Sequence, residues 1–177
     1  MMEDILKKIL QMREGKSEFK KLEENIKNMD DIKFEYLINR LKTQIEIVNK
    51  YKPKVRPALD PVISFELGVY RRLDDYEIGK LLNYPLCCIK SFSEDFRIAI
   101  DREHLKEAKE INTYAIVITS GFIPCSLKCK MAMKNGLLGY MDEEEFKKIL
   151  KLEEELKKKL KHFHSAYDEF YEKIIVG

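Results

Sequence analysis

The 177-residue sequence has no long apolar run and no strong excess of either charge. Its longest apolar stretches are far too short to cross a bilayer. The N-terminal segment Met1–Asp4 carries early acidic residues and no apolar signal core. The formal net charge is +2, so no global field favours a membrane surface or nucleic acid. These absences predict a cytoplasmic protein with no membrane partner.

Familiar catalytic signatures are also missing. The chain has no P-loop, no dinucleotide-binding fingerprint, no H-E-x-x-H motif and no nucleophile elbow. It shows no internal repeat and no low-complexity tract. Glutamine occurs only at Gln11 and Gln44, and Lys and Glu dominate a charged fraction of 36%. This bias resembles proteins of hyperthermophiles, and it identifies no reaction.

The composition and the spacing of apolar residues predict a mainly α-helical chain. Apolar residues make up 45% of the sequence, enough for a core, and the length fits a single domain. We expect one multi-helical domain over residues 1–177, with at most a minor β element near 114–120. Its expected parts are N-terminal helices at 1–50, a proline-containing linker at 51–61, a cysteine-bearing core at 62–140 and a long C-terminal helix at 141–177.

The C-terminal region carries the clearest helix signal. Asp142 and Glu145 form a predicted capping box, and the apolar spacing predicts one helix from about 142 to 174, ~50 Å long. So long a stripe predicts contact with the N-terminal helices or with a second subunit, which would make a homodimer through this helix. The stripe consists of Ile149, Leu152, Leu156, Leu160, Phe163, Tyr167, Phe170 and Ile174.

The most β-like stretch is Tyr114–Ser120. Its apolar run fits either a buried strand or a buried helical turn, and periodicity does not separate the two. A strand here has no evident partner elsewhere in the sequence. We therefore favour a helix or an extended core segment.

The stretch between Lys50 and Pro61 combines prolines with alternating basic residues. Its prolines exclude a continuous helix. A basic arm for nucleic acid, extended by Lys128–Lys134, is the weakest functional interpretation, because a few cations do not specify nucleic acid. We favour a solvated linker without a nucleic-acid partner. The residues concerned are Lys50, Lys52, Pro53, Lys54, Arg56, Pro57 and Pro61.

All four cysteines lie within one stretch, Tyr84–Cys129. Pro85 and Pro124 are each predicted to open a helix, because proline suits a first helical turn. On such helices the thiols four residues apart share a face, whereas the adjacent pair diverges by about 100°. Two helix starts with two thiols each predict one four-sulfur site, formed by Cys87, Cys88, Cys125 and Cys129.

Three states of these cysteines stay open. Four soft ligands suit zinc or an iron–sulfur cluster, and this metal centre with a redox or enzymatic role is the leading hypothesis. One or two disulfides, or a reversible redox pair, are the second state, since hyperthermophile proteins contain cytosolic disulfides. Buried inert thiols without a cofactor are the third. The alternative function is a non-enzymatic helical module for structure or interaction, stabilised by disulfides or buried thiols.

Other polar residues give weaker signals. We interpret the three histidines as surface residues, although imidazole is a common metal ligand. The pairs Arg71-Arg72 and Asp74-Asp75 could bind an anionic substrate beside the sulfurs, but solvated surface charge is the favoured interpretation. Two hydroxyls within the cysteine segments could donate to a sulfur or a substrate, and capping or packing explains them equally well. The histidines are His104, His162 and His164, and the hydroxyls belong to Tyr84 and Ser126.

Two motifs carry a resemblance to a known family. The segments G-K-L-L-N-Y-P-L-C-C-I-K-S-F and G-F-I-P-C-S-L-K-C resemble the largely archaeal domain-of-unknown-function family number 483. The motifs centre on residues 84–92 and 121–129, and the resemblance covers about residues 60–140. It implies an archaeal origin. It implies no reaction, cofactor or catalytic residue.

Overall fold

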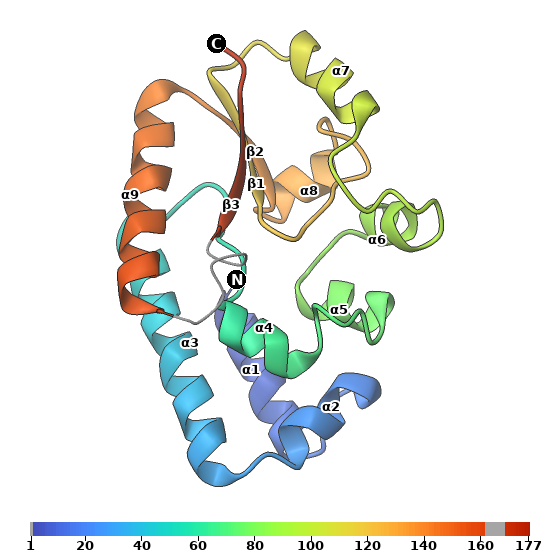
Figure 1. Ribbon diagram of the computed structural model, residues 1–177, viewed down its shortest axis with the longest axis vertical. Coiled ribbons are helices and arrows are strands. Elements are labelled where there is room, and N and C mark those ends of the chain that lie inside the picture. The colour runs from blue at the N-terminus through green and yellow to red at the C-terminus, as the bar shows by residue number, and fades with distance from the viewer. Residues whose placement is uncertain (1, 162–168) are drawn as a thin grey trace.

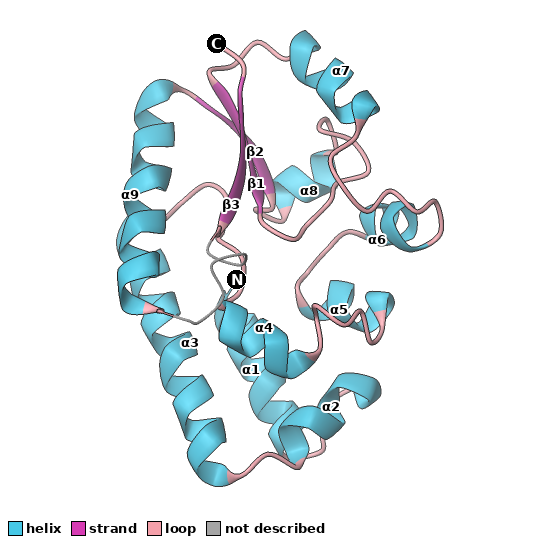
Figure 2. Cartoon of the chain, viewed as in Figure 1, coloured by secondary structure: helices cyan, strands magenta, loops and turns pink. Residues whose placement is uncertain are grey.

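Helices dominate the described part of the chain, and a small sheet crosses one half of it (Figures 1 and 2). The computed structural model describes residues 2–161 and 169–177. The elements in chain order are α1 Met2–Arg13, α2 Lys20–Lys27, α3 Asp31–Tyr51, α4 Pro61–Leu67, α5 Asp75–Leu81, α6 Leu86–Ser93, α7 Arg102–Glu110, β1 Ala115–Thr119, α8 Lys130–Lys134, β2 Leu138–Met141, α9 Glu143–Lys159 and β3 Tyr171–Ile175.

The helices α1 to α5 form one half of the molecule around their own apolar core (Figure 1). The stripe of Ile5, Ile9 and Met12 on α1 is buried, as the helical spacing predicts. Asp30 caps α3 by accepting a hydrogen bond from the Lys33 amide, and this 21-residue helix extends alongside α9 in the other half. The predicted helical character of the N-terminal region is confirmed.

The sheet has the order β2-β1-β3, and both pairings are antiparallel. The central strand β1 is buried along its whole length. Ala115 and Val117 pack into the core shared with α9, whereas Ile116 and Ile118 pack into the core beneath the cysteines. A strand covered on both faces needs a continuous apolar run, and this requirement explains the segment Ala-Ile-Val-Ile-Thr.

The mainly α fold with a minor β element is confirmed, but the β element is larger than expected. We favoured a helix or an extended core segment for Tyr114–Ser120, and the structure has the strand β1 there. The strands β2 and β3 are its partners, and the sequence did not reveal them.

The C-terminal helix is shorter than predicted. Its start is correct, since Asp142 and Glu145 form the reciprocal capping box. Its continuation to residue 174 is wrong, because α9 ends at Lys159 and Tyr171–Ile175 pair with β1. Phe163 and Tyr167 of the predicted stripe lie outside the described residues. The buried part of the stripe packs on the sheet and α3, so a homodimer through this helix stays a prediction.

The proline-containing linker is not solvated as predicted. Val55, Arg56 and Leu59 are buried between the two halves of the chain. The Arg56 amide donates to the Gly136 carbonyl, and the Ala58 amide donates to the Phe170 carbonyl. The sequence interpretation failed because arginine is rarely buried without a carboxylate partner. Lys52 and Lys54 are exposed, as expected.

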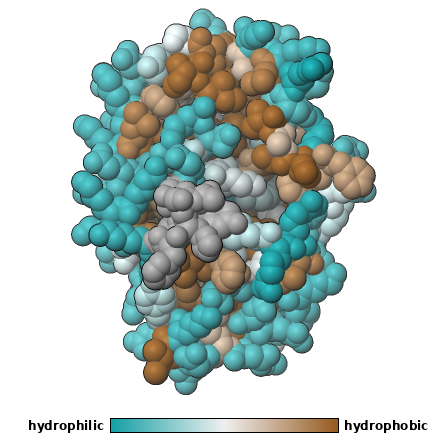
Figure 3. Space-filling model, in the orientation of Figure 1, coloured by the Kyte–Doolittle hydropathy of each residue, from teal (hydrophilic) through white to brown (hydrophobic). Residues whose placement is uncertain are grey.

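No helix among residues 2–161 and 169–177 has the length and apolar character needed to cross a membrane. Charged and polar side chains cover most of the face in Figure 3 over α9 and the N-terminal helices. Apolar side chains gather on the same face over the end of the sheet near the C-terminus and continue toward α6 (Figure 3). Exposed apolar residues in and after α6 are Leu86, Phe96 and Ile98.

Candidate metal centre

The four cysteines come from three adjoining segments. Cys87 and Cys88 lie in the first turn of α6, where no preceding helical turn stands beside their side chains. Cys125 lies in the loop after β1, and Cys129 is the N-cap residue of α8. Cys88 is buried, Cys87 is exposed, and the other two are partly buried.

The four sulfur atoms converge on one point. The Sγ atoms of Cys87 and Cys88 are 3.9 Å apart, and each lies 3.8 Å from the Sγ atom of Cys129. With Cys125 included, all four lie within 4.8 Å of one another. All four cysteines are free. A set of four sulfurs at this spacing can hold a metal ion. The four thiols therefore lie together, as predicted. The adjacent residues Cys87 and Cys88 both contribute, although adjacent side chains on a helix point in directions about 100° apart.

The loop that carries Cys125 is held by α7. The buried His104 imidazole accepts from the Asp101 amide at Nδ1 and donates from Nε2 to the Pro124 carbonyl, 2.7 Å away. Arg97, in the segment before α7, donates to the Cys125 carbonyl at 2.6 Å. Glu107 accepts from the Leu127 amide. Side chains thus satisfy backbone groups that a helix would satisfy internally.

The predicted helix starting at Pro124 is therefore wrong. Residues 125–129 form a bend and a turn, and α8 begins only at Lys130. Ser126 has a local role, because its hydroxyl bonds the Glu107 carboxylate and accepts from the Lys128 amide. Sequence reasoning missed Arg97 and Glu107, which carry no motif of their own.

The histidine prediction is wrong for His104, which is fully buried. His162 and His164 lie outside the described residues. The sequence did contain a signal for the local role of His104. Asp101 and His104 occupy the N-cap and third positions of α7 and form a capping box. Sequence reasoning looks for glutamate or glutamine at that third position and overlooks histidine.

The protonation of the thiols depends strongly on their surroundings. Burial and the neighbouring thiols raise the pKa of Cys88 far above its usual value, and burial with Cys129 nearby raises the pKa of Cys125 to about 11. Burial also acts to raise the pKa of Cys129, but the Ala132 amide and the other thiols outweigh it and lower that pKa. The four groups therefore do not all ionise near neutral pH without a cation. Binding of a metal would release protons.

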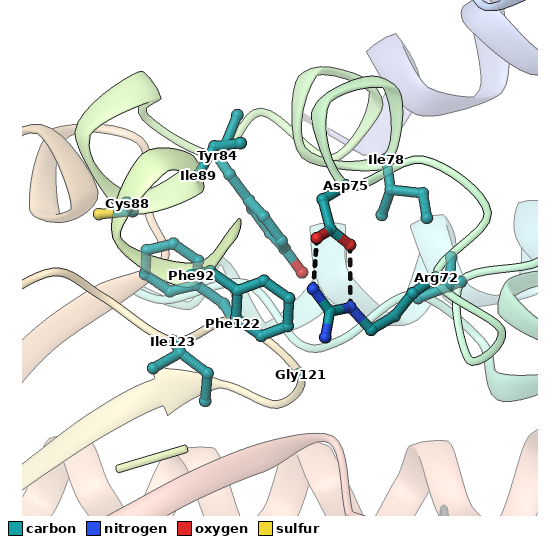
Figure 4. A pocket seen from close by; sticks show the side chains of 11 residues that line it. Arg72, Asp75, Ile78, Tyr84, Cys88, Ile89, Phe92, Gly121, Phe122 and Ile123 are labelled. Atoms are coloured by element: carbon teal, nitrogen blue, oxygen red, sulfur yellow. Dashed lines mark hydrogen bonds and ion pairs between the residues drawn. The ribbon is translucent and has the colours of Figure 1, made fainter. Parts of the chain in front are cut away.

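A small cavity adjoins the buried side of the cysteines (Figure 4). It has a volume of about 90 Å³, and Cys88 contributes to its wall. The rings of Tyr84 and Phe122 pack with centroids 4.8 Å apart. At the other side Arg72 pairs with Asp75, and its guanidinium carbon lies 4.6 Å from the centroid of the Phe92 ring.

The charged pairs predicted near the sulfurs have different surroundings. Arg72 and Asp75 pair with each other beside the cavity. Asp74 caps α5 and pairs with Lys21 at 2.7 Å, so it does not face the cysteines. Arg71 is exposed. Most of these four charged residues are therefore surface charges, as the favoured interpretation predicted.

Fold and site together define a mainly helical protein with a cluster of four cysteines. The chain belongs to the protein family of unknown function DUF483, whose model matches residues 41–157. This match confirms the resemblance carried by the two proline–cysteine motifs and extends it on both sides.

Two archaeal proteins, both described only as uncharacterized, are similar to the whole chain. One is from Methanocaldococcus jannaschii, is 59% identical, and the match covers 99% of this chain and all of the relative. The other is from Methanothermobacter thermautotrophicus, is 53% identical, and the match covers 99% of this chain and 98% of the relative. No solved structure matches the chain. The comparisons place the protein among archaeal relatives and supply no reaction.

Proposed function

We propose that this protein binds one metal ion, zinc in the first place, through the thiolates of Cys87, Cys88, Cys125 and Cys129. The observation that carries the proposal is the set of sulfur–sulfur distances of 3.8 to 3.9 Å. A tetrahedral ion with metal–sulfur bonds of about 2.3 Å has sulfur atoms about 3.8 Å apart. Three of the four side chains, those of Cys87, Cys88 and Cys129, therefore stand close to the spacing that one tetrahedral ion requires, and the Sγ atom of Cys125 lies within 4.8 Å of the others.

The same distances argue against an iron–sulfur cluster and against disulfides. In a cubane iron–sulfur cluster each cysteine binds a different iron, so its sulfurs stand farther apart than those around one ion. A disulfide needs a sulfur–sulfur bond of about 2.05 Å, well below the observed separations. A single iron with four thiolates has nearly the same geometry as zinc and is the second candidate. It would give the site an electron-transfer role.

The metal would act as a structural link. Four protein ligands leave no open coordination position, and closed sites of this kind stabilise folds. The ion would join α6 to the loop that carries Cys125 and to the start of α8. The helices α6 and α8 are eight and five residues long, too short to be stable without tertiary contacts. A metal bound there would contribute directly to folding.

Metal analysis of the native protein tests the proposal. Protein purified without oxygen and without a metal-affinity column should contain one zinc per chain. Replacing the metal with Co²⁺ should give the intense absorption of a tetrahedral four-thiolate site. Cys88→Ser, the buried ligand, should lose the metal and unfold at lower temperature. The matched control is Met131→Ser, which removes a sulfur from an exposed residue near Cys129.

Three results would change the assignment. If the protein contains one iron per chain and no zinc, the site would be assigned as an electron-transfer centre and not as a structural zinc site. Absence of any metal together with a thiol count below four in denatured protein would indicate disulfides. Absence of metal with four free thiols would leave a helical module with buried thiols. In the last two cases the metal proposal fails.

A further inference from the structure

Arg56 is a buried cation without a carboxylate partner among the described residues. Only 2% of its surface is exposed. One Nη atom donates to the Pro57 carbonyl at 3.0 Å and the other to the Leu82 carbonyl at 2.7 Å. A guanidinium has five N–H donors, and these two hydrogen bonds use two of them. Burial lowers the pKa of Arg56.

A partly buried arginine shows the usual pairing in the same protein. Arg40 pairs with the fully buried Asp60 through two hydrogen bonds, of 2.5 and 2.8 Å. This arrangement is the usual one, because a buried charge is costly unless it is paired. Arg56 departs from it. A buried guanidinium without a charged partner is more costly than a neutral residue of the same size, so its presence favours an anionic partner beyond the described residues.

The guanidinium borders a cavity with room for such an anion. The cavity has a volume of about 110 Å³, and Arg56 is the one cation among its described lining residues. Tyr84 also lines it, and its hydroxyl has no hydrogen-bond partner among the described residues. Burial raises the pKa of this phenol, so the hydroxyl stays a donor. The carboxylate of Glu169, another lining residue, is shared by Lys157 and Lys173.

This cavity adjoins the one beside the cysteines. Val69, Tyr84 and Gly121 belong to the walls of both. A Cβ atom built at Gly121 would meet nothing within 4 Å, so the backbone there borders open space. In Figure 4 the Tyr84 ring lies between the phenylalanine rings and the Arg72–Asp75 pair. The two cavities therefore offer a cationic end at Arg56 and an apolar end toward Cys88.

We infer that Arg56 and the Tyr84 hydroxyl bind the carboxylate of a small organic acid whose apolar or aromatic part occupies the cavity beside Cys88. A carboxylate carries one negative charge and matches the two-pronged donor geometry of a guanidinium. A phosphate dianion would need a second cation. The cavity beside Arg56 has none among its described lining residues, and Arg72 in the adjoining cavity is already paired with Asp75. The apolar half of the ligand follows from the rings of Phe92 and Phe122. The inference does not require a metal at the cysteines.

Nuclear magnetic resonance titration of the full chain tests this. The probes are phenylacetate, benzoate and butyrate, with phenylacetamide and inorganic phosphate as comparisons at millimolar concentration. The carboxylates should give saturable shifts of the backbone amides of residues 56, 58 and 59 and of residues 119–122. Phenylacetamide should bind at least tenfold more weakly. Arg56→Met should weaken carboxylate binding about tenfold to a hundredfold, since it removes charged hydrogen bonds.

The controls separate a ligand site from a structural arginine. Arg102→Met removes an exposed arginine and should leave binding unchanged. Tyr84→Phe removes only the hydroxyl and should weaken binding several-fold, which provides the test if Arg56→Met does not fold. Wild-type affinity in Arg56→Met, or in Tyr84→Phe if only that variant folds, would overturn the inference. Absence of saturable binding by all three carboxylates, or binding of phosphate alone, would do the same. Repeating the titration with Cys88→Ser shows whether binding survives loss of the metal.

Discussion

The Nε2 atom of His104 lies 2.7 Å from the carbonyl oxygen of Pro124, although twenty residues separate them in sequence. The imidazole is fully buried, and its other ring nitrogen accepts from the Asp101 amide. These two bonds assign the proton to Nε2 in the neutral ring. The bond fixes the residue immediately before Cys125. His104 thereby acts on the cysteine cluster as a positioning residue and not as a ligand.

Removing this donor should weaken both the fold and the metal site. In His104→Phe the buried Pro124 carbonyl loses its partner, and we expect a loss of about 1–3 kcal/mol in the free energy of unfolding. His104→Gln can still donate from its side-chain amide and should lose less. Urea denaturation measures the stability, and competition with a coloured chelator measures how fast metal leaves. Equal unfolding free energies for His104→Phe and wild type would contradict this role.

Asp101 should make the region sensitive to acid. The hydrogen bonds from Arg97, of 2.7 and 2.9 Å, are the main cause of a carboxyl pKa far below its usual range, and the His104 amide adds to them. A folded-state pKa below the unfolded value of about 3.9 stabilises the fold above about pH 4. That stabilisation is lost as the pH falls toward the folded-state pKa.

The variant Asp101→Asn isolates this effect. It should be less stable than wild type near pH 7, and the difference should shrink below about pH 4 because protonation removes the same charge from the wild type. Urea denaturation at several pH values measures the difference. Asp95→Asn, at an exposed position before α7, corrects for the change in net charge. A difference independent of pH would show that the carboxylate charge does not stabilise the fold.

The close contact of α5 and α6 depends on Gly79. A Cβ atom at this position would lie 2.5 Å from Cδ1 and 2.6 Å from Cγ1 of the buried Ile89. Gly79→Ala should therefore destabilise the protein by about 1–3 kcal/mol, despite the better helix propensity of alanine. In an Ile89→Ala background the same change should cost much less. Thermal unfolding of the four proteins in this cycle gives the coupling, and additive effects would exclude the predicted clash.

The structural features predicted well from sequence are the local ones. Asp142 and Glu145 form the predicted capping box within the first turn of α9, so the signal and the structure lie a few residues apart. The grouping of the cysteines was also predictable, because their two segments each combine a proline with two thiols. Their arrangement was not. The backbone of the Cys125 loop is held by hydrogen bonds to Arg97, His104 and Glu107. The loop sequence itself contains no signal that predicts these partners.

The C-terminal strand shows a different limit. Phe170 and Ile174 are four residues apart, a spacing that fits a helix with 3.6 residues per turn. Four is also a multiple of the two-residue period of a strand, so this pair alone does not distinguish the two. The pairing of Ile174 with Ile116 decides in favour of the strand. Such a partner, 58 residues earlier in the chain, leaves no trace in the local periodicity.

Glu153 should decide whether that strand stays in place. Its buried carboxylate accepts from the Phe170 and Tyr171 amides at 2.9 and 3.1 Å and pairs with Lys173 at 2.5 Å, so it fastens β3 to α9. Glu153→Leu should cost about 2–4 kcal/mol, because two buried amides lose their acceptor and the Lys173 ammonium keeps only Glu169 as a partner. Glu153→Gln keeps one acceptor and should cost less. Hydrogen exchange should quicken most at residues 171–175 in Glu153→Leu, with α1 as the internal control. Equal acceleration in both regions would instead indicate a general loss of stability, and unchanged exchange would show that β3 is held by its pairing with β1 alone.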